Sequence, residues 1–252
     1  GTAQGSHSGI SPLAMQLQAL SGTRGFACVT GAGNEAGFRH HYPGRLSPDQ
    51  AYEDVELRVA DSTAGFSMEL WADVSELYAV GFVSPSGEVI ERIPLAVGQE
   101  TTVSFQLDAT HIFISYQITE ASSGRFLAFL RFTAPAPGIW HIRVYPTLFV
   151  SGQFHIWLPM QEFLTEDTGF LRPDPDITIT DPGNAPLLLT ISTYNHVTES
   201  LYIHSSRGFT ATGQIKPDLA APGVEVQGPG LPRQDGSTFS GSTREAISSS
   251  AT

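Results

Sequence analysis

The residues best suited to chemistry lie near the end of the chain, in the run Gly241-Ser242-Thr243. A serine or threonine hydroxyl becomes a good nucleophile only when a neighbouring base removes its proton. The chain has eight histidines that are candidates for such a base. The run therefore raises the hypothesis of a hydrolase in which Ser242 or Thr243 attacks the substrate.

The histidines give no clear partner for these hydroxyls. His7, in "GSHSG", is not expected to be the base, and His40 and His41 are expected at a polar junction after the loop that contains Asn34. The remaining candidates are expected to be packed or exposed side chains on strands: His111, His141 and His155. No His-x-x-x-His pair is present, so the sequence predicts no metal site and no cofactor.

The charge balance restricts the classes of partner. The net charge is −12, from 13 basic and 25 acidic residues, and Lys216 is the only lysine. Nucleic acids and anionic membranes are therefore not expected as partners. Cys28 is the only cysteine, so no disulfide forms within the chain, and we expect it to be a small core residue. No apolar run approaches the length of a membrane span, and no signal peptide is visible.

The first 44 residues have the sequence pattern of an α/β protein. Leu13, Leu17 and Leu20 have helical spacing, with Ser11 as a candidate N-cap and Gly22 as a candidate stop. The apolar run "FACVTGAGN" follows and ends in glycines. A helix, a short buried strand and a glycine-rich loop in this order are typical of an α/β fold. Read alone, Asn34 in this loop is a turn residue that tolerates left-handed geometry.

The middle of the chain has a different pattern of apolar and polar residues. Residues 45–163 contain about eight short segments that alternate apolar and polar side chains, separated by breakers such as "SPSGE" and "APAPG". This pattern predicts an antiparallel β-sandwich of jelly-roll type. Residues 164–252 again have the α/β pattern of the first 44 residues, with the apolar run "APLLLTISTYN", which is expected to be buried. We therefore expect an α/β domain, residues 1–44 and 164–252, interrupted by a sandwich over residues 45–163.

Three motifs in this order carry a resemblance to a known family. They are Ala32-Gly33-Asn34-Glu35, then Ser205-Ser206-Arg207-Gly208 with the segment from Lys216 to Gly223, and last "STFSGST". Together they resemble the subtilisin-like serine proteases, or subtilases. The inserted sandwich makes the chain similar to the spore-germination members, and the resemblance covers the C-terminal part of the protease domain. It implies an α/β subtilisin-like fold with a parallel sheet and helices, interrupted by the jelly roll.

The resemblance also assigns roles to residues. It implies that Asn34 donates its side-chain N–H to the oxyanion of acyl transfer, where losing one such donor costs roughly 10²–10³ in rate. The family's Gly-Thr-Ser order is transposed here, so alignment puts Thr243 at the nucleophile, whereas a slip of one residue puts Ser242 there. Arg244 and Glu245 replace residues that pack the helix start in the family. The family's Asp and His motifs do not occur N-terminal to Asn34.

Three functions follow as hypotheses. The chain is part of a serine endopeptidase that is inactive by itself, because its Asp and His come from elsewhere. Alternatively, it is a pseudoprotease that binds a partner or a related protease. In a third view the sandwich is a binding module with a tryptophan platform of Trp71, Trp140 and Trp157, although their strand contexts fit core positions better.

The resemblance also sets expectations for partners and location. The expected partners are a protein or peptide substrate such as a zymogen, the missing N-terminal protease segment, or a related protease. The expected location is secreted or spore-associated in a bacterium.

Overall fold

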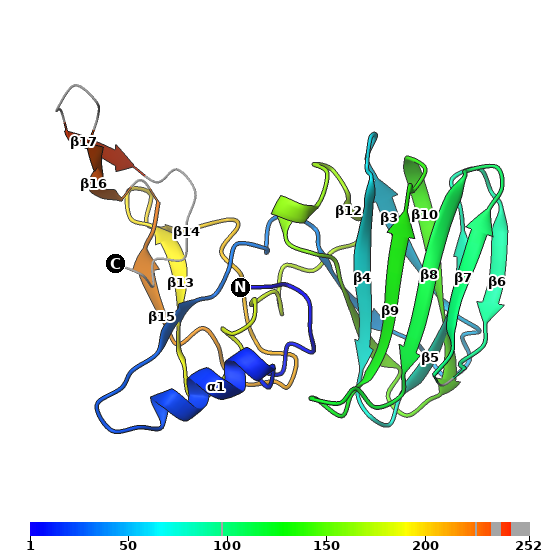
Figure 1. Cartoon of the computed structure of the whole chain (residues 1–252), viewed down its shortest axis with the longest axis horizontal. Coiled ribbons are helices and arrows are strands. Elements are labelled where there is room, and N and C mark those ends of the chain that lie inside the picture. The colour runs from blue at the N-terminus through cyan, green and yellow to red at the C-terminus, as the bar shows by residue number, and fades with distance from the viewer. Residues whose placement is uncertain (97, 225, 233–237, 243–252) are drawn as a thin grey trace. The chain divides into compact units, whose positions relative to one another are not determined.

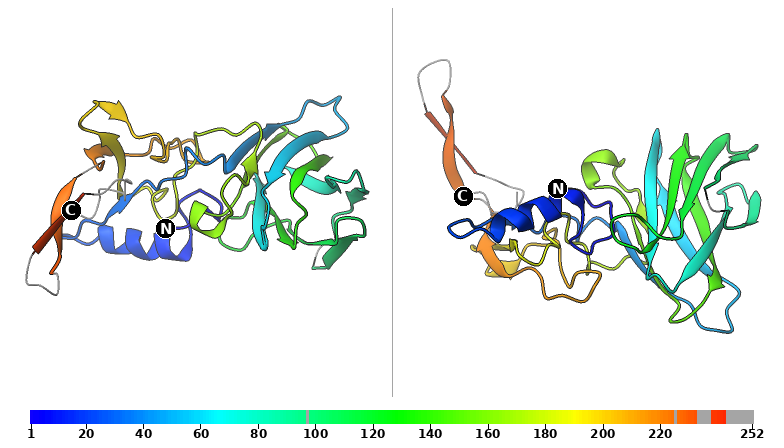
Figure 2. Two further views of the ribbon diagram at one scale, coloured as in Figure 1. Left: turned by 90° about the horizontal axis from the view of Figure 1, so that it is seen from above. Right: turned by 60° about the horizontal axis from the view of Figure 1, so that its bottom comes forward.

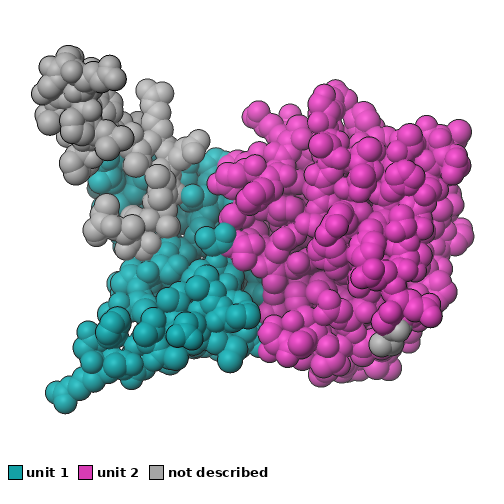
Figure 3. Space-filling model, viewed as in Figure 1, with its two compact units in different colours: residues 1, 7–37, 175–252 teal, residues 2–6, 38–174 magenta. Residues whose placement is uncertain are grey.

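The computed structural model describes residues 1–96, 98–224, 226–232 and 238–242 (Figure 1). The chain divides into two compact units (Figure 3). Unit 1 comprises residues 1, 7–37 and 175–252, and unit 2 comprises residues 2–6 and 38–174. The predicted domain boundaries lie at residues 44/45 and 163/164. They stay predictions, as does the independent folding of each unit.

Unit 2 consists of two antiparallel sheets. The five-stranded sheet has the order β12 (Gly169–Phe170), β3 (Glu53–Val59), β10 (Gly138–Leu148), β5 (Leu77–Val83) and β6 (Val89–Ile93). The six-stranded sheet has the order β2 (His41–Arg45), β11 (Gln153–Trp157), β4 (Gly65–Ala72), β9 (Phe126–Thr133), β8 (Thr110–Gln117) and β7 (Glu100–Phe105). A short 3₁₀ helix, Gln161–Phe163, follows β11.

Alternation along the strands builds one core between the two sheets. In β10 the buried residues are Trp140, Ile142 and Val144, which lie two apart and so share a face. They belong to a single apolar cluster with residues of both sheets. Trp71 and Trp157 are buried as well. Because the three tryptophans are not exposed, they do not form a binding platform.

Unit 1 is built around a small sheet and one helix. Strands β1 (Val29–Gly31) and β15 (Leu219–Pro222) both pair in parallel with β13 (Leu189–Asn195), and β14 (Ser200–Leu201) pairs antiparallel with it. Helix α1 spans Pro12–Ser21 (Figure 2). The side chain of Ser11 accepts a hydrogen bond from the Ala14 amide at 3.0 Å, which confirms the predicted N-cap. Strands β16 (Gln227–Pro232) and β17 (Thr238–Ser242) form an antiparallel hairpin.

The predicted α/β subtilisin-like fold with a parallel sheet and helices is wrong. In the described residues α1 is the only α-helix, with 10 residues, and most strand pairs are antiparallel. The apolar runs do form parallel pairs, β1 with β13 and β13 with β15, but the described connections around them are irregular and not helical. Residues 171–188 contain four prolines and residues 202–218 contain turns, which do not support helices. The β-sandwich is consistent with the structure, whereas its jelly-roll connectivity stays a prediction.

Candidate functional site

The loop Ala32–Glu35 lies directly after β1, at the carboxyl end of that strand. Gly33 has a φ of +101°, and a Cβ at this position would lie 2.6 Å from Thr180 Oγ1. Both the backbone conformation and the close approach therefore require glycine. The Thr180 amide donates a hydrogen bond to the Ala32 carbonyl at 2.9 Å and fixes the start of the loop.

Ser206 holds the backbone on both sides of Asn34. The Ser206 amide donates to the Gly33 carbonyl, and the Glu35 amide donates to Ser206 Oγ, each at 2.9 Å. Ser206 is buried, so these bonds are protected from water. Asn34 is therefore presented by a loop whose preceding carbonyl and following amide are both bonded to a single residue.

The turn that carries Ser206 is itself anchored in unit 1. The Thr193 amide of β13 donates to Ser205 Oγ at 2.9 Å. The Arg207 amide donates to Thr178 Oγ1, and the Thr178 amide donates back to the Arg207 carbonyl, each at 3.0 Å. The Ser-Ser-x-Gly motif therefore fixes the position of the asparagine loop through these hydrogen bonds.

The side chain of Asn34 is partly buried. Its Oδ1 atom is shielded from solvent and has no hydrogen-bond partner among the described residues. A buried polar atom without a partner is rare in folded proteins and calls for a ligand or another group to satisfy it. Oδ1 is an acceptor, so a group that satisfies it must be a hydrogen-bond donor.

The Lys-Pro-Asp motif has a structural role. The buried Lys216 donates from Nζ to the Leu188 carbonyl at 2.5 Å and to Asp218 Oδ2 at 2.6 Å. The same carboxylate oxygen accepts the Thr190 amide at 2.7 Å. This ion pair fixes the start of β15 beside β13.

One carboxyl group near the loop has a shifted pKa. Asp181 follows Thr180, and burial raises the pKa of its carboxyl. A hydrogen bond donated by Ser11 Oγ to Asp181 Oδ2 at 2.7 Å lowers that pKa but does not cancel the effect of burial. Asp181 therefore links the N-cap of α1 to the segment that fixes the asparagine loop.

The two candidate nucleophiles are not brought to this loop by the described structure. Ser242 is the last residue of β17, where its backbone lies opposite Gln227. The side chain of Ser242 and the whole of Thr243 lie outside the described residues. Their roles stay predictions, as does the role of Asn34.

The histidines belong to both units. His7 is a buried residue of unit 1 whose carbonyl accepts the Ala211 amide at 3.1 Å. In unit 2, His41 Nδ1 lies 3.2 Å from the Asp174 carbonyl, and its Nε2 lies 2.9 Å from His155 Nδ1. A carbonyl only accepts, so His41 Nδ1 donates to Asp174, and His155 Nδ1 donates to His41 Nε2 in the neutral pair.

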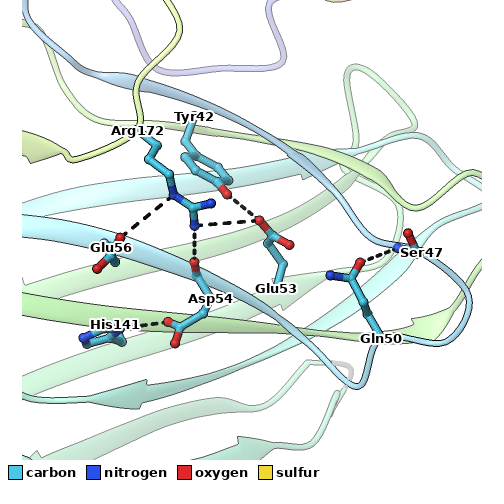
Figure 4. Close-up of polar contacts among 8 residues, drawn as sticks. All are labelled: Tyr42, Ser47, Gln50, Glu53, Asp54, Glu56, His141 and Arg172. Carbon is cyan, nitrogen blue, oxygen red and sulfur yellow. Dashed lines mark hydrogen bonds and ion pairs between the residues drawn. The ribbon is translucent and has the colours of Figure 1, made fainter.

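Two other histidines of the sandwich, His111 and His141, pair with polar side chains of neighbouring strands. His111 Nδ1 lies 2.8 Å from Ser104 Oγ on the neighbouring strand β7. His141 Nδ1 lies 3.0 Å from Asp54 Oδ1 (Figure 4). His40 is buried in unit 2. No group of three or more metal-binding side chains occurs among the residues that the structure describes.

Sequence reasoning missed a polar cluster around Arg172, shown in Figure 4. Tyr42 Oη donates to Glu53 Oε1 at 2.6 Å. The Arg172 guanidinium donates to the Asp54 carbonyl at 2.8 Å and lies 3.9 Å from the Glu56 carboxylate. Burial, and then the hydrogen bond to Glu53, raise the pKa of the Tyr42 phenol well above its usual value. The cluster fastens the segment after β12 to β3, and nothing in the local sequence around Arg172 indicates it.

Comparison with known proteins gives a likeness to a solved structure. No protein-family model matches the chain, and no curated protein matches it. The structure is similar to that of the Clostridium perfringens CspB protease, with a TM-score of 0.82 and 25% sequence identity. The match covers 96% of this chain and 50% of the CspB chain, so the chain spans half the length of that protein. This likeness supports the resemblance to subtilase-like proteins and a protease-related function. Within the described residues, no helix is both long and apolar enough to span a membrane.

Proposed function

We propose that this chain is part of a subtilisin-like serine endopeptidase and that Asn34 is its oxyanion donor. The observation that supports this most is the loop around Asn34, because Ser206 bonds the backbone on both sides of this residue. A preorganised side-chain amide of this kind stabilises the negative charge that develops on an attacked carbonyl oxygen.

The 252 residues are proposed to hydrolyse no peptide by themselves. Acyl transfer by a hydroxyl needs a base that accepts its proton and a third group that orients the base. The sequence has no Asp-x-Gly or His-Gly-Thr motif N-terminal to Asn34. An aspartate and a histidine from another polypeptide segment would complete the site, with Thr243 or Ser242 as the nucleophile.

A pseudoprotease is the second candidate. The transposed order Gly241-Ser242-Thr243, followed by Arg244 and Glu245, favours it. A threonine at the nucleophile position carries an extra methyl group that restricts its side-chain rotamer and crowds the approach of a substrate. Such a protein would bind a partner or a related protease without cleaving it.

The biological setting is part of the same proposal. The substrate would be a protein or peptide, such as a zymogen, and the process would be spore germination in a bacterium. The protein would be secreted or associated with the spore. The likeness to a clostridial protease supports this setting.

The Asn34→Ala variant of the complete gene product tests the oxyanion role. We expect kcat on a fluorogenic peptide to fall roughly 10²–10³-fold, with KM little changed, because the donor acts mainly in the transition state. Asn195→Ala is the control, since the Asn195 side chain caps an exposed turn by accepting the Val197 amide at 2.9 Å and the Thr198 amide at 3.2 Å. An unchanged kcat in Asn34→Ala contradicts the proposal, and a complete gene product that hydrolyses no peptide favours the pseudoprotease.

A further inference from the structure

Strand β7 is the outermost strand of the six-stranded sheet in unit 2, and it stops before its partner β8 does (Figure 1). Their pairing begins at Glu100, which lies opposite Ser115, whereas β8 continues to Gln117. Tyr116 and Gln117 pair with β9 on their other side. Neighbouring residues of an antiparallel strand direct their backbone N–H and C=O groups to opposite edges. One of these two residues therefore presents both groups on the side that β7 leaves uncovered.

A turn explains why β7 begins only at Glu100. The Gln99 amide donates to the Ala96 carbonyl at 3.3 Å, and Gly98 within this turn has a φ of +69°, a conformation that favours glycine. A Cβ at Gly98 would have no atom within 4 Å. The space beside Gly98 is therefore open.

A groove of about 600 Å³ lies where β7 does not cover β8. Its lining comes from Gly98 and Glu100 at the start of β7, and from residues 115–119 at the end of β8 and just after it. We call it the β8 groove. Its volume lies within the range of ligand pockets, roughly 300–1,000 Å³. The partly buried Ile118 contributes an apolar side chain to the lining.

The end of β8 is held in place by Tyr116. The Tyr116 hydroxyl donates to the Ile93 carbonyl at 3.1 Å and accepts the Val80 amide at 3.0 Å, and the side chain is buried. These bonds join β8 to β5 and β6 of the other sheet. A rigid edge loses little conformational freedom when a segment binds to it, which favours binding.

The β8 groove has acidic surroundings. Glu100 is an exposed residue of the lining. Glu120 directly follows Thr119; burial raises the pKa of its carboxyl, but hydrogen bonds from Ser122 and Ser123 outweigh burial and lower the pKa to about 2. Glu120 is therefore ionised at neutral pH, and the whole chain has a net charge of −12. A segment that carries lysine or arginine is thus electrostatically complementary to the groove.

We propose that the β8 groove binds an extended basic segment of a partner protein. The segment continues the row of β7, its backbone pairs with the end of β8, and its cationic side chains lie near Glu100. In such strand addition the backbone hydrogen bonds supply affinity and the side chains supply specificity. A second copy of this chain is disfavoured, because each copy carries a net charge of −12 and like charges repel. The proposal does not depend on peptide hydrolysis.

A labelled peptide of alternating threonine and valine, with two lysines at each end, tests the proposal by fluorescence anisotropy. We expect it to bind the 252-residue chain and to shift the NMR signals of the Ser115, Gln117 and Thr119 amides. A peptide with glutamates in place of the lysines is expected to bind at least about tenfold more weakly, because its charge is repelled. Methylation of alternate backbone amides of the lysine peptide is expected to weaken binding about tenfold, because hydrogen bonds to β8 are lost.

Glu100→Lys reverses the charge of the lining. It is expected to weaken binding of the lysine peptide about fivefold and to strengthen binding of the glutamate peptide. Glu91→Lys, at an exposed residue of β6, changes the net charge equally and is the matched control. It is expected to leave the affinity for the lysine peptide unchanged, and the circular dichroism of both variants is expected to match that of the parent chain.

Four results would overturn the proposal. They are no binding of the lysine peptide at millimolar concentration, shifted signals that lie away from residues 115–119, equal binding of the methylated peptide, and a control variant that weakens binding as much as Glu100→Lys. A dimer of this chain that Glu100→Lys dissociates overturns the proposal in favour of a second copy.

Discussion

At the scale of single residues, the turn that contains Ser206 holds the loop that contains Asn34, although the two are far apart in the sequence. Ser206 binds the carbonyl before Asn34 and the amide after it. Only the second bond uses the side chain of Ser206, so a substitution can remove it while the backbone bond remains. The rigidity of the Asn34 loop therefore depends on the Ser206 hydroxyl.

Ser206→Ala is expected to loosen this loop. The Glu35 amide loses its acceptor in a buried site, so the free energy of unfolding is expected to fall by about 1–3 kcal/mol. Hydrogen exchange at the Glu35 amide is expected to accelerate, which NMR or mass spectrometry would detect. Ser200→Ala is the control, since its hydroxyl bonds only an exposed Thr198 hydroxyl at 2.7 Å. Equal exchange rates in the parent and in Ser206→Ala would refute this role of Ser206.

Part of this residue-level arrangement could be predicted from the sequence. The motifs around Asn34 and Ser206 are recognisable, because glycines and hydroxyl residues mark the loops. Their contact could not be predicted, since the hydrogen bond from Glu35 to Ser206 joins residues 171 positions apart. The same holds for the hydrogen bond between Arg172 and the Asp54 carbonyl, which spans 118 positions.

At the scale of elements, a single carboxylate organises the turn between β10 and β11. Glu76 accepts hydrogen bonds from the amides of Val150, Ser151 and Gly152 and from the Tyr78 hydroxyl. Burial alone would raise the pKa of Glu76, but the hydrogen bonds from Ser151, Val150 and Gly152 outweigh it and lower the pKa below the ordinary value of 4.5. The ionised form is thus the one that the fold stabilises.

The sandwich is therefore expected to lose stability in acid through Glu76. Because its pKa is lower in the folded state, the contribution of Glu76 is fully present above pH 4.5 and is lost as the pH falls through the folded pKa. Urea unfolding at pH 7 and at pH 3.5 is expected to show a smaller pH dependence for Glu76→Gln than for the parent chain. Glu91→Gln, at an exposed strand residue, is expected to keep the parental dependence. Identical pH dependence in all three proteins would contradict this account.

The elements also show where sequence patterns succeed and fail. The helix over Pro12–Ser21 and its Ser11 cap are confirmed, because local signals determine both. The α/β prediction failed on its helices: the run "APLLLTISTYN" does form a strand, β13, with parallel partners on both sides, but α1 is the only α-helix in the described residues. Within β13 Leu189 is exposed, whereas residues 190–193 are buried. Hydrophobic residues alone do not specify whether a face is covered by the same chain.

At the scale of the whole molecule, the two units differ in the size of their cores. The cluster of unit 2 contains residues from both sheets, including Trp140, Phe82 and Phe132. The cluster in unit 1 contains Ala14, Ala185 and Leu188. The apolar cluster of unit 1 is therefore smaller than that of unit 2. Unit 1 also holds the asparagine loop, so the candidate site lies in the unit with the smaller apolar cluster.

The most direct test of the central claim uses the purified 252-residue chain and a fluorophosphonate probe that labels activated serine nucleophiles. The account holds that this chain presents an oxyanion donor, Asn34, but no activated nucleophile, so we expect no labelling above that of heat-denatured protein. An active serine hydrolase added to the same tube serves as the control for the probe. Stoichiometric labelling that disappears in Ser242→Ala or Thr243→Ala would contradict the claim.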